Sequence, residues 1–229
     1  PVLIQRPVYT PFSDVVTRNG RRVVNHALNL INGMYFMDLE KLEEQIIHED
    51  IKLMLLCSPH NPVGRVWTRQ ELMKLGEVCR RHSVIVVSDE IHSDFVYPGY
   101  KHHVFTTACP EMEDYSVICT APSKTFNLAG LQTSNLMIPN DQLREMLKKE
   151  IARTGFGQCN QLGLVACQAA YEGGKEWLDD VRAYLKGNLD YVKQFVEERL
   201  PMLQVIEPEG TYLLWMDLRK LRLSKEELN

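Results

Sequence analysis

The sequence has few of the features that mark proteins of membranes or nucleic acids. No segment approaches the roughly 18 consecutive apolar residues that a bilayer-spanning helix needs, and no signal-peptide pattern is present. The formal net charge is −4, and basic pairs such as Arg21-Arg22 and Arg80-Arg81 stand among acidic residues. They form no basic stripe with interleaved aromatic residues. We therefore expect neither a membrane nor a nucleic-acid partner.

Cysteine pairs and metal-ligand spacings are also missing. The six cysteines lie far apart without a Cys-x-x-Cys pair, and several stand inside apolar runs, where a free thiol behaves as a small hydrophobe. This usage predicts a reducing compartment, most simply the cytoplasm. His92, His102 and His103 have no His-x-x-x-His spacing or carboxylate partners at helical spacing, so we expect no metal site.

What remains is the composition of an ordinary globular protein, with 45% hydrophobic and 24% charged residues. The chain opens on "PVLIQ", which is typical of the start or middle of a strand. It closes on "LSKEELN", where Ser224 and Glu227 match the capping box that precedes a helix. These ends lead us to expect an excerpt of a longer protein.

Short apolar runs alternate with helical patterns in the first 140 residues. The segment 68–82 has a helix-start signal in Thr68 and Glu71 and one apolar face. Continuous apolar strands separated by helices predict an α/β architecture with a mainly parallel sheet covered on both faces. The strand-like runs are 52–57, 83–88, 115–120 and 133–138.

The pattern becomes mainly helical after about residue 140. Helical stretches include "DQLREMLKKEIAR" and "NQLGLVACQAAYEGG", and a long one runs from Lys175 to about Leu200, where Pro201 ends it. Two short strand-like runs around a Pro-Glu-Gly turn follow in "LQVIEPEGTYLLWMDLR". A helix of this length often connects two lobes, so we expect a second, smaller α+β domain to begin after it.

Polar side chains stand just after three of the predicted strands. Asn61 lies in the Pro-rich turn of "LLCSPHNPVG", Asp89 and His92 follow "VIVVS", and Ser123 and Lys124 follow "VICTAP". Ligands of open α/β sheets bind at the carboxyl ends of the strands. We therefore expect an amide, a carboxylate and a lysine from separate strands to converge on one small volume.

Each of these residues, taken alone, has a purely structural explanation. Asn61 would shape a turn by hydrogen-bonding its own backbone, and Asp89 would cap the following helix. Lys124 would be a surface residue whose stem lies along apolar neighbours. The residues themselves leave these alternatives open.

Taken together, the motifs resemble those of a known family. "SPHNPVGRVWT", "SDEIHSDFVYPG" and "APSKTFNLAGLQTSN", in this order and at these separations, resemble the fold-type I enzymes that use pyridoxal 5′-phosphate, of the class I/II aminotransferase superfamily. They most closely resemble its cystathionine β-lyase or cysteine-conjugate C–S lyase branch. The resemblance extends over essentially all 229 residues, including "AAYEGGKEWL" and "PEGTYLLWMD".

The resemblance implies a role for each strand-end residue. Lys124 would hold the cofactor aldehyde as an imine and, once released, remove the Cα proton of the substrate. Asp89 would pair with the pyridine nitrogen and keep it protonated, so that the ring accepts electrons from Cα. Asn61 would donate to the ring O3′ oxygen, and His92 would support Asp89, at a position where many aminotransferases have tyrosine.

Three further positions carry the resemblance or depart from it. Tyr9, in "RPVYTPF", matches the aromatic residue that stacks on the cofactor ring, although a partly buried aromatic in a Pro-rich loop would look the same. Ser123 matches a phosphate contact or a turn-forming serine. Common aminotransferases carry an arginine eight residues after the lysine, and this chain has Gln132 there. That departure favours the lyase branch.

The resemblance also implies the domain division and the activity. We expect a pyridoxal-phosphate-binding large domain, incomplete at its N-terminus, over 1–175, and an interdomain helix over 176–200. The start of a truncated small domain would occupy 201–229, in a large-domain fold of the seven-stranded type. The implied function is a C–S β-lyase, acting on a small amino-acid thioether such as cystathionine and releasing thiol, pyruvate and ammonia. The alternatives are an aminotransferase and a catalytically incomplete or regulatory module on the same scaffold.

The family's remaining active-site groups fall outside this sequence. The phosphate-binding helix start and an active-site tyrosine given by the neighbouring subunit would precede Pro1, and the arginine that binds the substrate carboxylate would follow Asn229. The resemblance therefore implies a homodimer and a chain that does not run the full reaction alone.

Overall fold

A computed structural model describes residues 1–224 and 226–227, and its centre is a six-stranded sheet. All neighbouring strands are parallel except the last pair, in which the edge strand runs antiparallel. The strands in spatial order are β2 (Val23–Asn25), β1 (Val2–Ile4), β5 (Leu53–Cys57), β6 (Ile85–Asp89), β7 (Ser116–Thr120) and β8 (Asn135–Met137). This is the mainly parallel α/β sheet that the sequence predicts, and no seventh strand joins it within the described residues.

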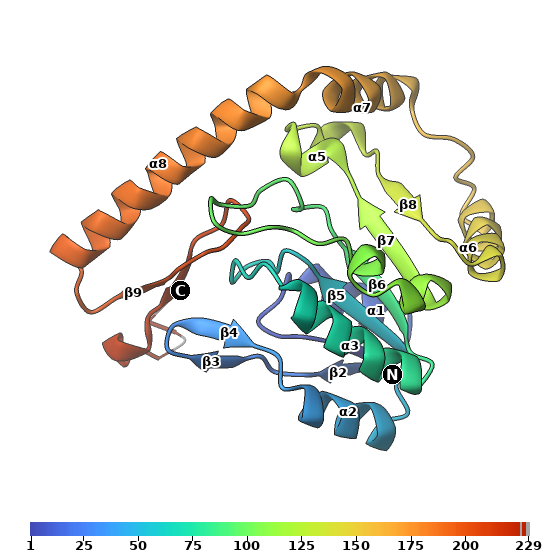
Figure 1. Ribbon diagram of the computed structural model, residues 1–229, viewed down its shortest axis with the longest axis horizontal. Coiled ribbons are helices and arrows are strands. Elements are labelled where there is room, and N and C mark those ends of the chain that lie inside the picture. Colours follow the sequence, from blue (N-terminus) through green and yellow to red (C-terminus); the bar gives the residue numbers. More distant parts are fainter. Residues whose placement is uncertain (225, 228–229) are drawn as a thin grey trace.

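The four strands predicted from apolar runs all form, with ends shifted by at most two residues. The opening "PVLIQ" contains β1, as predicted. Helices separate the consecutive sheet strands up to β7, and the crossover helices lie against the sheet (Figure 1). The helices are α1 (Pro11–Arg18), α2 (Leu39–His48), α3 (Arg69–Arg81), α4 (Phe105–Ala108), α5 (Pro122–Thr125), α6 (Asp141–Arg153), α7 (Gln161–Gly173) and α8 (Lys175–Arg199), with 3-10 turns at η1 (Pro110–Tyr115), η2 (Ala129–Leu131) and η3 (Arg219–Leu221).

Successive side chains of each strand point to opposite faces of the sheet, and both faces are buried. On one face, residues such as Leu3, Leu56 and Val86 join the main core with α2, α3 and α4. On the other face, Ile4 and Cys57 pack with Phe12 of α1, next to β1 and β2. Burial on both faces explains why the strands are continuous apolar runs rather than alternating ones.

Helix α3 begins where the sequence predicts, and its capping box forms. The Thr68 side chain accepts from the backbone N–H of Glu71, while the Glu71 carboxylate accepts from the backbone N–H of Thr68. Leu72, Leu75 and Cys79 on its inner face are buried in the main core. The cap therefore fixes the start of the helix that covers β5 and β6.

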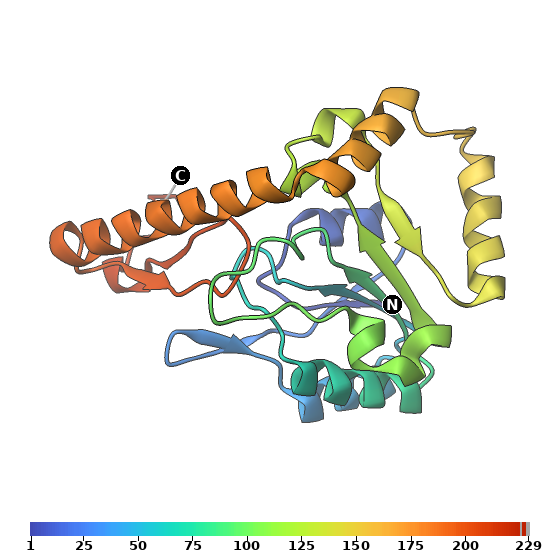
Figure 2. The same ribbon diagram turned by 45° about the horizontal axis from the view of Figure 1, so that its top comes forward.

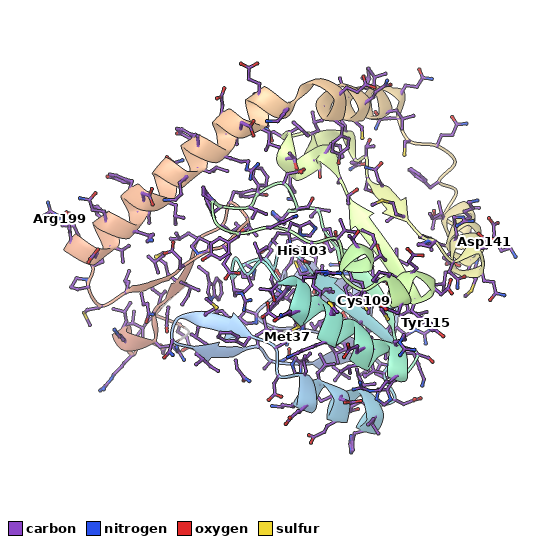
Figure 3. All side chains as sticks on the ribbon, viewed as in Figure 1. Met37, His103, Cys109, Tyr115, Asp141 and Arg199 are labelled. Carbon is purple, nitrogen blue, oxygen red and sulfur yellow. The ribbon has the colours of Figure 1, made fainter. Side chains whose placement is uncertain are left out.

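The last third of the chain is mainly helical and then forms a separate two-stranded hairpin. Helix α8 has 25 residues and runs from α7 along one side of the molecule, as Figures 1 and 2 show. Its inner residues Leu189 and Val196 are buried. The predicted pair of strands forms an antiparallel hairpin, β9 (Gln204–Ile206) with β10 (Trp215–Asp217). In Figure 3, the labelled Asp141 and Arg199 mark the start of α6 and the end of α8.

Three short strands are elements that the sequence pattern does not predict. Strand β2 extends the sheet edge, and β3 (Asn29–Ile31) and β4 (Met34–Phe36) form a separate hairpin around Asn32 and Gly33, both at positive φ. Each strand has three residues, too few for alternation to be recognised. None of the helices in the described part of the chain is long and apolar enough to cross a membrane.

Candidate active site

The register of the central strands brings the predicted site residues to one edge of the sheet. Asp89 is the last residue of β6, and it pairs with Cys57 at the end of β5 and with Cys119 near the end of β7. Asn61 lies in the loop after β5, Asp89 ends β6, and Lys124 lies on the short helix directly after β7. The predicted convergence of an amide, a carboxylate and a lysine therefore occurs.

Asp89 occupies the centre of this edge in a partly desolvated position. Its Oδ1 accepts one hydrogen bond, from the backbone N–H of Ile91 at 3.2 Å. The pKa of Asp89 is raised to about 6, mainly by burial and to a smaller extent by the adjacent Glu90, against the opposing effects of the Ile91 hydrogen bond and the positive charge of Lys124. The site therefore destabilises the unpaired carboxylate, and a cation that pairs with Asp89 would stabilise it.

Lys124 lies on α5, a single turn of helix directly after β7. Pro122 starts this turn, which is the position where a missing N–H costs nothing. Thr125 is buried and donates its hydroxyl to Asp94 Oδ2 at 2.8 Å, which fixes the turn to the loop after β6. Within residues 1–224 and 226–227, Lys124 Nζ has no hydrogen bond or ion pair. The half-buried Ser123 precedes it on the same turn.

His92 lies between Asn61 and the lysine. The Asn61 Nδ2 atom is 3.5 Å from His92 Nε2, and burial, with a smaller effect of the Lys124 charge, lowers the pKa of His92 to about 4. The imidazole is therefore neutral at neutral pH and accepts at Nε2, which leaves its proton on Nδ1. That buried Nδ1 atom has no partner among the described residues.

Tyr9 joins the site through the backbone of the Asn61 loop. Its N–H donates to Asn61 O at 3.0 Å, its ring meets Phe12 edge-on, and 42% of the residue is exposed. Tyr9 and Asn61 both line a cavity of about 1020 Å³ that extends towards Tyr35 and Trp215. An exposed ring beside a large cavity is free to contact a ligand.

Gln132, the departure from the aminotransferase pattern, stands after the η2 turn. It is exposed and adopts a left-handed backbone conformation with φ of 50°. A second cavity, of about 490 Å³, lies between residues 95–100 and α8 and is not lined by any of the predicted site residues. The predicted site residues therefore lie at the carboxyl ends of the strands and beside the larger cavity.

The sequence pattern did not single out three buried charged residues near the site. Glu90 follows Asp89 and accepts from Ser88 Oγ, from His102 Nε2 and from the backbone N–H of Phe105, all at 2.9 Å. Arg65 and Glu209 form a buried ion pair at 2.9 Å, although 144 positions separate them. A charged residue inside an apolar motif, as in "PVGRVW", was the signal that could have indicated such pairs.

A family model for class I and II aminotransferases matches residues 1–228. The chain belongs to this family. It is 42% identical to the cystathionine β-lyase PatB of Bacillus subtilis (strain 168), over 99% of this chain and 59% of that protein. Its fold matches cystalysin from Treponema denticola, whose structure contains a pyridoxal 5′-phosphate cofactor, with a TM-score of 0.96 and 37% identity over 99% of this chain and 58% of the other.

A second solved structure agrees with the first. The pyridoxal-phosphate-bound C–S lyase from Staphylococcus hominis matches with a TM-score of 0.92 and 36% identity, over 98% of this chain and 57% of that one. The chain thus spans somewhat less than 60% of the length of these relatives. Membership of the family and its large-domain fold are established, and the branch named by the sequence motifs is the one to which these relatives belong.

Proposed function

We propose that the protein carrying this chain is a pyridoxal-phosphate-dependent C–S β-lyase. Its substrates would be cystathionine or a related cysteine thioether, and its products a thiol, pyruvate and ammonia. The observation that carries this proposal is the meeting of Lys124, Asp89 and Asn61 at the ends of three neighbouring strands. Relatives named as cystathionine β-lyase and C–S lyase support the choice of reaction.

The donor set of the site fits the proposed cofactor. Asp89 offers a carboxylate whose raised pKa falls again when a cation pairs with it. Lys124 offers an amine that makes no hydrogen bond or ion pair with any described residue. The buried Nδ1 of His92 also lacks a partner among these residues. A pyridinium nitrogen would pair with the carboxylate, an aldehyde would react with the amine, and a ring hydroxyl is a hydrogen-bonding partner of the kind that the imidazole lacks.

Pyridoxal phosphate, when bound, supplies an aldehyde for covalent attachment and a ring that accepts electrons from the substrate Cα. Lys124 would hold the cofactor through Nζ and then accept the Cα proton at the same atom. Asp89 would pair with the ring nitrogen and keep it protonated. Both residues reach these tasks from adjacent strand ends, so the sheet fixes their separation.

Four other residues would orient the cofactor. The Asn61 amide would donate to the ring oxygen, with the neutral His92 ring behind it. Tyr9 would stack on the ring from the side of the large cavity. Ser123, one position before the lysine, would contact the phosphate.

An aminotransferase is the second candidate, because the family as a whole carries that name. The same residues would serve both reactions, since both begin with removal of the Cα proton and diverge afterwards, when a lyase expels the thiolate from Cβ and an aminotransferase returns the proton to a different carbon. The position of Gln132, where common aminotransferases have arginine, supports elimination over transamination.

The deciding assay measures pyruvate. We expect the intact protein, loaded with pyridoxal phosphate, to release pyruvate from cystathionine in stoichiometric yield without any keto acid. Lys124→Ala should lose this activity, because it removes the amine that would accept the Cα proton. Pyruvate-free turnover that needs a keto acid would instead identify an aminotransferase, and no turnover at all would leave only the regulatory-module alternative.

The remaining expectations are proposals of the same kind. We place the protein in the cytoplasm, where its six unpaired cysteines would stay reduced. A large domain over 1–175, an interdomain helix over 176–200 and the start of a small domain over 201–229 are supported by the long α8 and the hairpin after it. We also propose a homodimer as the working form.

A further inference from the structure

A segment from the C-terminal part of the chain lies between the two loops that carry Asn61 and His92. We call residues 208–212 the brace. The backbone N–H groups of Glu209 and Gly210 donate to Gly64 O, at 2.8 and 3.0 Å, on the Asn61 side. On the other side, Tyr97 N donates to Glu209 O and Thr211 N donates to Phe95 O. The brace thus joins both loops through main-chain hydrogen bonds.

The brace also fits closely against the loops through side chains and bare backbone. Tyr212 places its ring 5.2 Å from that of His92 and 5.3 Å from that of Phe95. A Cβ on Gly64 would lie 2.6 Å from Pro208 Cβ, and a Cβ on Gly210 would lie 2.7 Å from Phe95 O. No side chain therefore fits between the brace and the loops at these two positions.

One buried arginine ties the brace to the rest of the site. Arg65 donates through Nε to Glu209 Oε2 at 2.9 Å, and the same oxygen accepts from the backbone N–H of Val66 at 2.7 Å. Arg65 Nη2 donates to both carboxylate oxygens of Glu71 at 2.9 Å, and its Nη1 donates to Tyr35 O. Arg65 therefore connects the brace, the cap of α3 and the β3–β4 hairpin.

The Arg65 guanidinium is buried, and most of its N–H groups are hydrogen-bonded. Arg65 and Glu209 are 4% and 5% exposed. The guanidinium lies over the rings of Trp67 and Phe36, at 4.7 and 5.3 Å from their centroids. A buried ion pair is rarely retained for stability alone, because apolar residues of similar volume serve as well or better.

The arginine also shares a tight turn with Asn61. The backbone N–H of His60 donates to Arg65 O, and Gly64 N donates to His60 O, both at 2.8 Å. Asn61 stands within this closed turn, so a displacement of Arg65 is transmitted to the amide. We propose that Arg65 and Glu209 are positioning residues that hold Asn61 and, through the brace, His92 in the geometry required by the cofactor site. This inference rests on the proposed function.

The test compares single-site variants of the intact protein. Glu209→Gln keeps the shape of the side chain but removes its charge and one of its acceptor sites. We expect faster hydrogen exchange of the backbone N–H groups in residues 58–65 of the cofactor-free variant, by about tenfold. We also expect the pH dependence of the visible absorption of bound pyridoxal phosphate to move by about one pH unit, the equivalent of one ordinary hydrogen bond.

Two further variants separate positioning from simple stability. Arg65→Lys keeps the charge but lacks the planar fork that reaches three partners, so it should behave as Glu209→Gln does. The double variant Arg65→Met/Glu209→Gln removes the buried cation, so it should regain melting temperature while its spectrum stays shifted. Glu43→Gln is the matched control, since it removes a half-buried carboxylate, distant from the brace, whose two oxygens bind Arg81 at the end of α3.

The outcomes distinguish the inference from the proposed function. A Glu209→Gln or double variant with the exchange rates and spectrum of the parent protein would overturn the positioning role, even if its melting temperature fell. If the parent protein developed no visible absorption with pyridoxal phosphate, the proposed function would fail. The exchange rates of the cofactor-free variants would still decide whether the pair holds the loop.

Discussion

Asp89 is the residue whose environment says most about what is bound beside it. Its carboxylate ends β6 with a single hydrogen bond and with a pKa raised by burial. A group held in this way costs free energy in the cofactor-free protein, and the cost is recovered only by a cationic partner. The sequence placed Asp89 after a strand but left a helix-capping role open, and the absence of any helix directly after β6 removes that alternative in the described residues.

Replacing Asp89 by asparagine should stabilise the cofactor-free protein above about pH 6. The folded-state pKa, about 6, lies above the ordinary value of 3.8, so protonation favours folding and that stability is lost as the pH rises from 3.8 through about 6. The two proteins should therefore be nearly equal near pH 4. Asp89→Asn should become more stable by at most about 3 kcal/mol at neutral pH.

Urea unfolding of both proteins across this pH range measures the difference. Because every other ionisable group is common to both proteins, its contribution largely cancels in the comparison. A difference that shrinks as the pH rises would contradict the assigned environment. Saturating pyridoxal phosphate should reverse the order, since the ring nitrogen then pairs with Asp89.

The elements show which signals in a sequence are strong enough to predict a fold. Apolar runs of five or six residues and the Thr68–Glu71 capping box gave correct strands and the correct start of α3. Strands β2, β3 and β4 and the single turns α4 and α5 were not predictable, because their positions depend on neighbours distant in the chain. Helix α5, which carries Lys124, is such a turn, and only the resemblance indicated its importance.

Two glycines in helices test the packing of α3 against the short α4–η1 segment. A Cβ on Gly76 would lie 2.4 Å from Cys109 Sγ, in the region where Figure 3 labels Cys109 beside α3, whereas a Cβ on Gly187 of α8 meets nothing within 4 Å. Gly76→Ala should destabilise the protein by about 1–3 kcal/mol through overpacking. Gly187→Ala should stabilise it by about 0.5–1 kcal/mol through helix propensity.

Equilibrium unfolding in denaturant measures the change in unfolding free energy for each variant, provided that the denaturant slopes of the variants are equal. Gly187→Ala serves as the control for propensity, so the difference between the variants isolates the contact with Cys109. If Gly76→Ala were as stable as Gly187→Ala, the close packing of α3 on this segment would be wrong.

At the scale of the whole molecule, the site is assembled from three sequence regions and held by a fourth. Strand positions follow from local apolar patterns, and ligands of open α/β sheets bind at the carboxyl ends of strands, which is why the meeting of Asn61, Asp89 and Lys124 could be predicted from the sequence. The brace could not be predicted in the same way. The pairing of Arg65 with Glu209 spans 144 positions, and no periodicity or spacing encodes it.

The most direct test of the account asks which atom holds the cofactor. The intact protein is mixed with one equivalent of pyridoxal phosphate, reduced with borohydride and digested, and the modified peptide is identified by mass spectrometry. We predict a single reduced adduct on Lys124, absent from Lys124→Ala. An adduct on another lysine, or none in the parent protein, would contradict the account.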